Sequence, residues 1–155
     1  MALPDTQPPR PPARTGTHQV RVRYCECDPM GVVHHASYFP WLEIGRTELL
    51  RDTGVTYAQL EASGVFLVLT RAAMSYRRPG RYDDLVEIRT NVVGGSRVKI
   101  EHEYEVWAVV RGVHPSLPPG SGPEMLATAQ TTLACVGRDG KVRELPEWLV
   151  APPTT

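Results

Sequence analysis

A short segment near the N-terminus contains residues that could carry out nucleophilic or acid–base chemistry. The segment CDPMGVVHH, residues 27–35, places an aspartate before a proline and ends in two histidines. An accessible aspartate is ionised at neutral pH, so Asp28 could attack a carbonyl carbon directly or take a proton from water. The residues alone do not separate these two mechanisms. An Asp before Pro can also serve only to cap a turn, and this interpretation stays open.

The backbone of the same segment could stabilise negative charge on a carbonyl oxygen. Gly31 allows the chain to turn tightly, and His35 stands at the entry to a stretch with helical spacing. Unpaired N–H groups at the start of a helix, together with its dipole, stabilise a developing oxyanion. We therefore expect the backbone around His35 to donate to the oxyanion, and the His35 side chain to orient substrate or water near Asp28.

A metal site is an alternative interpretation of the histidines and cysteines in this region. The candidate ligands are His18, Cys25, Cys27, His34 and His35. Cys-x-Cys followed by His-His fits no standard zinc spacing, and neighbouring side chains point in different directions. We therefore expect no metal here.

A long helix is predicted directly after the segment. Apolar residues recur at helical spacing from Tyr38 to about Thr53, Ser37 is a suitable N-cap, and Gly54 is a typical residue to end a helix. Gly45 lies inside this helix and costs about 1 kcal/mol relative to Ala. We therefore expect another element to press closely on the face that carries Gly45.

The rest of the chain has the pattern of strands. One strand is predicted at 18–24, before the segment, and a short helical stretch at 56–63 follows the long helix. Four more strands are predicted, joined by turns at 79–80 and 94–95 and by a Pro/Gly-rich loop at 111–123; they cover 65–77, 84–93, 97–110 and 125–136. A final helical turn is predicted around Trp148.

This order of elements predicts an α+β fold. Five antiparallel strands would form a curved sheet that wraps around the long central helix. The helix carries apolar residues off its main stripe, at Phe39, Ile44 and Leu50, as expected if the sheet curls around it. Such a sheet leaves a long edge strand open, and edge-to-edge pairing of two subunits is a common way to cover it.

Length and composition indicate one domain. The chain has 155 residues, and we assign 18–150 to the domain, 1–17 to a disordered Pro-rich tail and 151–155 to a disordered C-terminus. Seventeen basic residues balance 17 acidic ones, so no basic field for nucleic acid is expected. No apolar run is long enough for membrane insertion, and three cysteines, an odd number, favour free thiols in the cytoplasm.

The pattern YxExDxxGxVxHxxYxxxxExxR, residues 24–46, resembles the 4-hydroxybenzoyl-CoA thioesterase family of the hot-dog superfamily. It looks closest to the small bacterial acyl-CoA thioesterases associated with the Tol-Pal system. The segments 81–84, 94–96 and 127–136 also fall where this family has them, so the resemblance covers about residues 18–148. Position 34 departs from the pattern, because relatives carry Tyr where this chain has His34.

The resemblance implies a function and an assembly. It implies a hot-dog homodimer, often paired again into a homotetramer, with active sites at the subunit interface. The implied reaction is hydrolysis of an acyl-CoA thioester to a carboxylic acid and free coenzyme A, with Asp28 as the catalytic carboxylate and the His35 amide as the main oxyanion donor. No cofactor is implied, since coenzyme A is part of the substrate.

Other residues could bind the substrate. Tyr38 could line the acyl pocket or belong to the core. Four arginines flank turns that could converge at one end of the sheet and bind the phosphates of coenzyme A, or could be ordinary solvated charges; they are Arg77, Arg78, Arg81 and Arg97. Glu43 and Arg46 are three residues apart and could pair on the helix surface as structural or interface residues.

Two alternative functions remain open at this point. The chain could be a hot-dog hydratase or dehydratase, although such enzymes place their catalytic groups differently. It could also be a non-catalytic protein that binds acyl thioesters, against which the intact Asp28 argues. Neither the acyl group nor the thiol carrier, coenzyme A or acyl carrier protein, follows from these residues.

Overall fold

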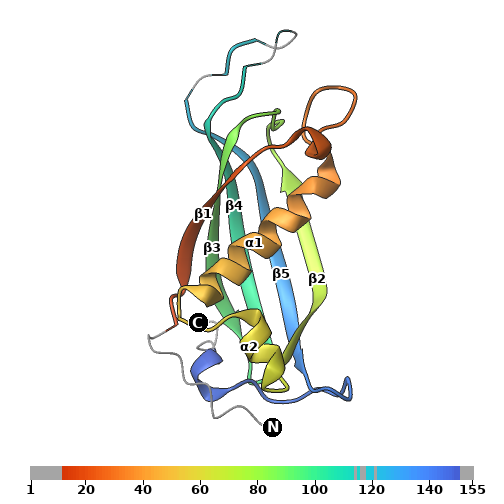
Figure 1. The fold of residues 1–155 in the computed structure, drawn as a ribbon, viewed down its shortest axis with the longest axis vertical. Coiled ribbons are helices and arrows are strands. Elements are labelled where there is room, and N and C mark those ends of the chain that lie inside the picture. Colours follow the sequence, from red (N-terminus) through yellow and green to blue (C-terminus); the bar gives the residue numbers. More distant parts are fainter. Residues whose placement is uncertain (1–11, 114, 116–117, 121, 151–155) are drawn as a thin grey trace.

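The computed structural model describes residues 12–113, 115, 118–120 and 122–150. One five-stranded antiparallel sheet curves around a single long helix (Figure 1), which confirms the predicted α+β hot-dog architecture. The strands are β1 (Thr15–Arg21), β2 (Phe66–Tyr76), β3 (Leu85–Gly95), β4 (Lys99–Val110) and β5 (Glu124–Val136). The helices are α1 (Tyr38–Arg51) and α2 (Tyr57–Ala62), with 3-10 turns η1 (Tyr24–Glu26), η2 (His35–Ser37) and η3 (Glu147–Leu149).

The strand order across the sheet is β1-β3-β4-β5-β2, so β1 and β2 are the two edges. Central strands β3 and β4 alternate between buried and more exposed residues along most of their length. Their buried side chains, among them Ile88 and Val106, face α1 and pack against Trp41 and Leu42 of the helix. The core therefore lies between the concave face of the sheet and α1.

A close approach between α1 and β3 confirms the role predicted for Gly45. A Cβ at this position would overlap Oγ1 of Thr90 and lie 2.9 Å from Cγ2 of Ile88. The off-stripe residues behave differently from one another, because Leu50 is buried and Ile44 is half-buried, whereas Phe39 is 39% exposed. The sheet therefore covers less of the helix in the single chain than the apolar pattern predicts.

Strand β1 begins earlier than predicted. Thr15, Gly16 and Thr17 pair with Asn91, Thr90 and Arg89 of β3. The assignment of residues 1–17 to a disordered tail is therefore wrong for 15–17, and residues 1–11 and 151–155 lie outside the described part. The sequence did not predict a strand at residues 15–17, because Thr-Gly-Thr shows no apolar alternation. In the structure, a Cβ on Gly16 would lie 2.8 Å from Cδ1 of Leu49. Gly16 thus lets the end of α1 approach the edge strand.

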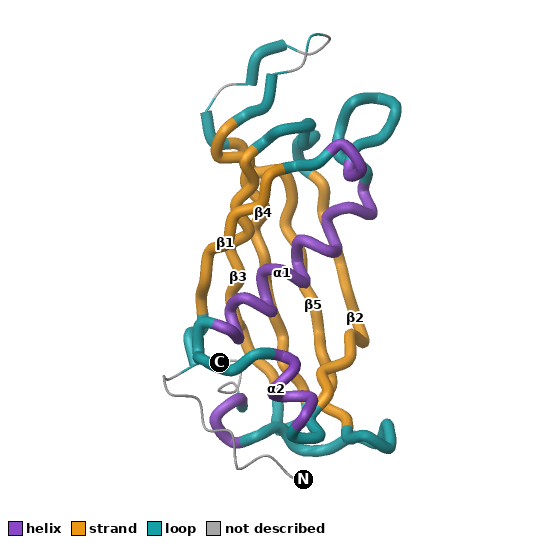
Figure 2. The backbone as a smooth tube through the Cα atoms, viewed as in Figure 1, coloured by secondary structure: helices purple, strands orange, loops and turns teal. Residues whose placement is uncertain are grey.

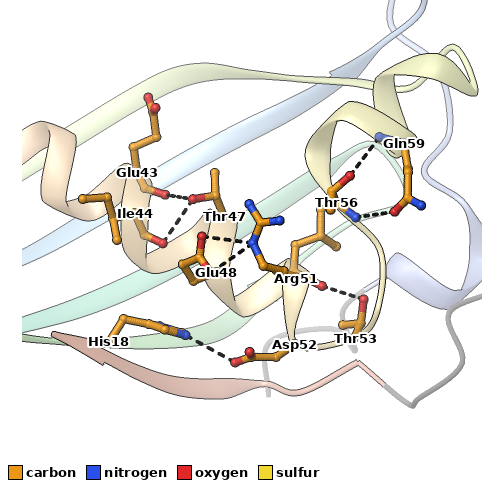
Figure 3. Close-up of polar contacts among 11 residues, drawn as sticks. His18, Glu43, Ile44, Thr47, Glu48, Arg51, Asp52, Thr53, Thr56 and Gln59 are labelled. Carbon is orange, nitrogen blue, oxygen red and sulfur yellow. Dashed lines mark hydrogen bonds and ion pairs between the residues drawn. The ribbon is translucent and has the colours of Figure 1, made fainter.

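Polar contacts secure the C-terminal end of α1 (Figure 3). Asp52, which follows the helix, lies 3.3 Å from Nε2 of His18 on β1. The hydroxyl of Thr53 donates to the carbonyl of Leu50 at 2.6 Å. Thr56 and Gln59 then form a reciprocal capping box that starts α2. No helix in the described part of the chain has the length and hydropathy that crossing a membrane requires.

Candidate active site

The segment that carries Asp28 forms a small ribbon beyond the N-terminal end of α1 (Figure 2). Cys27 and Val33 form an antiparallel bridge, and the Asp28 N–H donates to the carbonyl of Val32 at 2.9 Å. Next to this bridge, the His34 N–H donates to the carbonyl of Glu26 at 2.8 Å. Residues 26–28 and 32–34 therefore form two paired arms, and this pairing fixes the turn that connects them.

Asp28 itself begins the turn at the tip of the ribbon. Its Oδ1 accepts a 2.9 Å hydrogen bond from the Met30 N–H, and its carbonyl accepts from the Gly31 N–H. Gly31 has a φ of +80°, a conformation that favours glycine, which confirms its predicted role in shaping the turn. Asp28 therefore caps the turn as the alternative interpretation proposed. Its second carboxylate oxygen has no hydrogen-bond or ion-pair partner among the described residues.

The buried carboxylate of Glu26 anchors the ribbon to α1. Its Oε1 accepts from Nε1 of Trp41 at 3.1 Å and from the Arg23 guanidinium, while its Oε2 accepts from the Arg23 N–H at 2.8 Å. The carbonyl of Glu26 also accepts from the Ser37 hydroxyl at 2.9 Å. Ser37 thus ties the ribbon down through its side chain, and does not cap α1 as predicted.

The His35 amide is the unpaired donor next to the ribbon. His35 opens η2, and its N–H finds no acceptor within the described part of the chain. The next amide, on Ala36, is capped by Nδ1 of His34 at 3.0 Å. The predicted set of free donors around His35 is therefore reduced to one, and His34, which the sequence left without a role, is a capping residue.

Strand β2 holds the other side of the His35 residue. The hydroxyl of Tyr76 donates to the His35 carbonyl at 2.8 Å. Partial burial raises the pKa of Tyr76, so this hydroxyl keeps its proton at neutral pH. The Tyr76 ring also packs edge-on against Tyr38, with centroids 5.2 Å apart.

Tyr38 belongs to the core in the single chain. It is 2% exposed, packs against Trp41, and its burial raises its pKa to about 12. The structure therefore supports the core interpretation of Tyr38, and the prediction that it lines an acyl pocket gains no support from the described surface.

The four candidate arginines do not converge. Arg77 and Arg78 are exposed and follow directly on Tyr76, so they lie at the same end of the sheet as His35. Arg97 lies in the β3–β4 turn at the opposite end, where it pairs with Glu144 at 3.3 Å. Arg81 is 9% exposed and donates to the carbonyl of Pro118. Arg81 nevertheless lies at the same end as Arg77 and Arg78, where it bridges Val32 of the ribbon. The expected convergence is therefore wrong for Arg97, whereas Arg81 is in place but buried in the single chain.

A buried ion pair supports the same end of the sheet and was missed in the sequence. Asp84 is fully buried, and its Oδ2 lies 3.3 Å from Nη1 of Arg111. The two carboxylate oxygens also accept from the N–H groups of Arg81 and Gly112. Asp84 thereby joins the β2–β3 turn to the end of β4. In the sequence, the only indication of a role for Asp84 was its place in segment 81–84, which the resemblance to the family includes.

Cysteines and potential metal ligands are dispersed. All three cysteines are free thiols, and burial raises the pKa of Cys27 and of Cys135. Within the described ranges, no group of three His, Cys, Asp or Glu side chains could hold a metal ion. The groups available for chemistry at the ribbon are therefore the Asp28 carboxylate, the His35 amide and the His35 ring.

Comparison with known proteins identifies the family. The thioesterase-like superfamily matches residues 22–152. A putative acyl-CoA thioesterase of Bacillus subtilis is 30% identical over 138 residues, which are 86% of this chain and 91% of that protein. A probable thioesterase from Bartonella henselae superposes with a TM-score of 0.71 at 31% identity, over 85% of this chain and 99% of that one.

A second solved structure shares the architecture. The DHNA-CoA thioesterase from Staphylococcus aureus superposes with a TM-score of 0.73 at 25% identity, over 87% of this chain and 83% of that one. The match to the family spans the ribbon, the central helix and all strands except β1, which ends one residue before the match begins. The chain therefore belongs to the thioesterase-like superfamily and is a thioesterase with the hot-dog fold.

Proposed function

We propose that this protein hydrolyses acyl-CoA thioesters to a carboxylic acid and free coenzyme A, with Asp28 as the catalytic carboxylate. The observation that carries the proposal is the state of the Asp28 side chain: one oxygen is held by the Met30 N–H, and the other has no partner in the described structure. The carboxylate is thus oriented and still able to react. The names of the relatives in Bacillus subtilis and Staphylococcus aureus support the substrate class.

Two chemical roles fit a carboxylate held in this way. As a nucleophile, Asp28 attacks the thioester carbonyl and expels coenzyme A thiolate, and water then hydrolyses the resulting anhydride. As a general base, it takes a proton from water while the oxygen of that water attacks the carbonyl. In both cases the carbonyl oxygen becomes negatively charged. The free N–H of His35 is the donor that we assign to it, and such a donor is typically worth about 3 kcal/mol.

The ribbon carries both groups at one end of the molecule. Cys27 bridges Val33, and the Asp28 N–H donates to the Val32 carbonyl, so the turn that Asp28 begins and the His35 amide belong to the same short ribbon. Both groups must lie about 3 Å from the reacting carbonyl. We assign the site that they form to the interface of a homodimer, as the resemblance to the family implies.

Edge strand β2 is the surface that we assign to dimer formation. One side of its backbone pairs with β5, while the other side forms the edge of the sheet. Val68 and Leu69 on this strand are 41% and 49% exposed, which is costly for apolar side chains on an open edge. Two such dimers could pair again into a homotetramer. The free thiols favour a cytoplasmic location.

The phosphates of coenzyme A require cations near the reacting end. Arg77 and Arg78 supply them in this proposal, because both are exposed and stand next to Tyr76, which contacts His35. Their backbone N–H groups both donate to the Leu126 carbonyl, so the chain that carries them is anchored. A guanidinium pair suits phosphate well.

Release of free thiol from a panel of acyl-CoAs tests the function. Short aliphatic, long-chain and aromatic thioesters are compared, each also presented on acyl carrier protein, with wild-type protein at equal concentration. Turnover of at least one acyl-CoA is expected. Binding without turnover of any thioester would favour the non-catalytic alternative, and addition of water to an enoyl thioester without release of thiol would favour a hydratase.

A further inference from the structure

A cavity of about 160 Å³ lies at the C-terminal end of α1, away from the ribbon. Its walls come from α1, α2, β2, β3, β4, η3 and residues 12–14. They are mainly apolar and include Leu49, Leu50, Leu67, Val92, Ile100 and Trp148. Of the α1 residues that line the cavity, Arg46 lies nearest to the N-terminal end of the helix. It is eight positions beyond the first residue, Tyr38, which is roughly 12 Å along the helix axis. The cavity is therefore separate from the Asp28 turn, which precedes that start.

A cation with little compensating charge lines this cavity. The Arg46 side chain is 12% exposed, and its ion-pair partner Glu43 is 3.8 Å away with a side chain that is 67% exposed. The pair predicted for the helix surface is thus loose, and Arg46 faces inward. Arg14 also lines the cavity, and no acidic residue does so within the described part of the chain. The cavity is therefore electropositive.

A buried histidine in the wall has an unused hydrogen-bonding atom. His102 on β4 is 6% exposed, and its Nδ1 has no hydrogen-bond partner among the residues that the structure describes. Burial, and to a smaller extent the charge of Arg46, lowers the pKa of His102 to about 4, so the ring is neutral at pH 7 and offers one N–H donor. An unpaired buried polar atom costs about 1–3 kcal/mol, which a bound acceptor would recover.

Tyr57 adds a third polar group to the same wall. Tyr57 is the first residue of the short helix α2, and it lines the cavity together with Arg46. Burial raises the pKa of Tyr57 to about 12, so its hydroxyl remains a donor at neutral pH. The charge of Arg46 acts on both Tyr57 and His102, so the three groups lie near one another and give the cavity a polar patch that can donate hydrogen bonds.

We propose that this cavity binds a small apolar monocarboxylate, with its carboxylate on Arg46, Tyr57 and His102 and its hydrocarbon against the leucines and Trp148. One buried guanidinium neutralises the single negative charge of a carboxylate. A phosphate carries more than one negative charge, and its additional charge would be buried against apolar walls without a partner. A cavity of about 150 Å³ is known to hold benzene, so the hydrocarbon is the size of a phenyl ring or of a chain of about five carbons. The site is distinct from the Asp28 turn and does not depend on turnover.

Equilibrium binding of benzoate and hexanoate, compared with neutral benzamide and hexanamide, tests the proposal. Isothermal titration is carried out on wild-type protein, on Arg46→Gln, and on the matched control Arg51→Gln. Arg51 belongs to the same helix, pairs with Glu48 on the surface, and does not line the cavity. Benzoate is expected to bind at least tenfold more tightly than benzamide. Arg46→Gln should remove this preference and Arg51→Gln should retain it.

Two further measurements locate the ligand and protect the test against a variant that does not fold. In wild-type protein, benzoate should shift the imidazole resonances of His102 at stoichiometric saturation, while Asp28→Asn should bind benzoate as wild type does. Val92→Phe, which fills the cavity and leaves Arg46 intact, should abolish binding. Equal affinity for benzoate and benzamide, an unshifted His102, or loss of binding in Asp28→Asn would each overturn the proposal.

Discussion

The Tyr76 hydroxyl donates to the carbonyl of His35, so strand β2 holds the residue whose N–H we assign to the oxyanion. Tyr76→Phe removes this bond and keeps the ring that packs on Tyr38. One neutral hydrogen bond is worth about 1 kcal/mol, so kcat should fall about fivefold to tenfold with little change in KM. Steady-state kinetics with an acyl-CoA substrate check this, and an unchanged kcat would show that Tyr76 does not position His35.

Glu26 should matter mainly because it holds Trp41. Glu26→Ala leaves Nε1 of Trp41 buried without an acceptor, and should lower the free energy of unfolding by about 1–3 kcal/mol. Glu26→Gln keeps an acceptor and should cost less than half as much. Urea denaturation followed by tryptophan fluorescence measures both. Equal losses in the two variants would mean that the charge of Glu26, through its pair with Arg23, is the important part.

The Asp84–Arg111 pair should be critical for stability, since both side chains are nearly inaccessible to water. Asp84→Asn leaves the buried Arg111 cation with only the more distant and partly exposed carboxylate of Glu124, 3.9 Å away, and should destabilise the protein by about 3 kcal/mol. Glu144→Gln, which breaks the exposed pair with Arg97, is the matched control and should cost less than about 1 kcal/mol. Similar urea midpoints for the two variants would contradict the assignment.

Stability should fall as pH is lowered from about 6.5 towards 4. The pKa of His102 is about 4 in the folded protein and near 6.5 when unfolded, so the unfolded chain binds the additional proton across this window. Arg46 faces the ring from α1, and Tyr104 stacks beside it on β4. The full effect is roughly 3 kcal/mol. His102→Gln should flatten this part of the curve of unfolding free energy against pH, and an equal slope in both proteins would contradict it.

The overall fold could be predicted because its signals are local. Helical spacing from Tyr38, alternation in β3 and β4, and Gly54 after α1 each report the structure of their own segment. The start of β1 was missed because residues 15–17 form a strand through backbone pairing with β3. Their own side chains do not show the alternation that predicts a strand.

The site was predictable only in part, because its other features depend on contacts between distant segments. The turn at Asp28 and Gly31 follows from residue types within four positions. The separation of Arg97 from Arg77 follows from strand topology, and the pairing of Asp84 with Arg111 joins two turns 27 positions apart. His102 and Arg46 lie on different elements, so neither spacing nor composition could indicate that they share a cavity.

The most direct test of the central claim compares Asp28→Asn with Asp139→Asn. Both aspartates accept from the N–H two residues later, at 2.9 Å for Asp28 and 3.0 Å for Asp139, and asparagine can keep this bond in either turn. Only Asp28 stands in the ribbon beside His35. Loss of a catalytic base or nucleophile at Asp28 should lower kcat/KM for the best acyl-CoA by a factor of about 10² to 10⁴, while Asp139→Asn stays within twofold of wild type. An Asp28→Asn protein that releases thiol at nearly the wild-type rate would contradict the account.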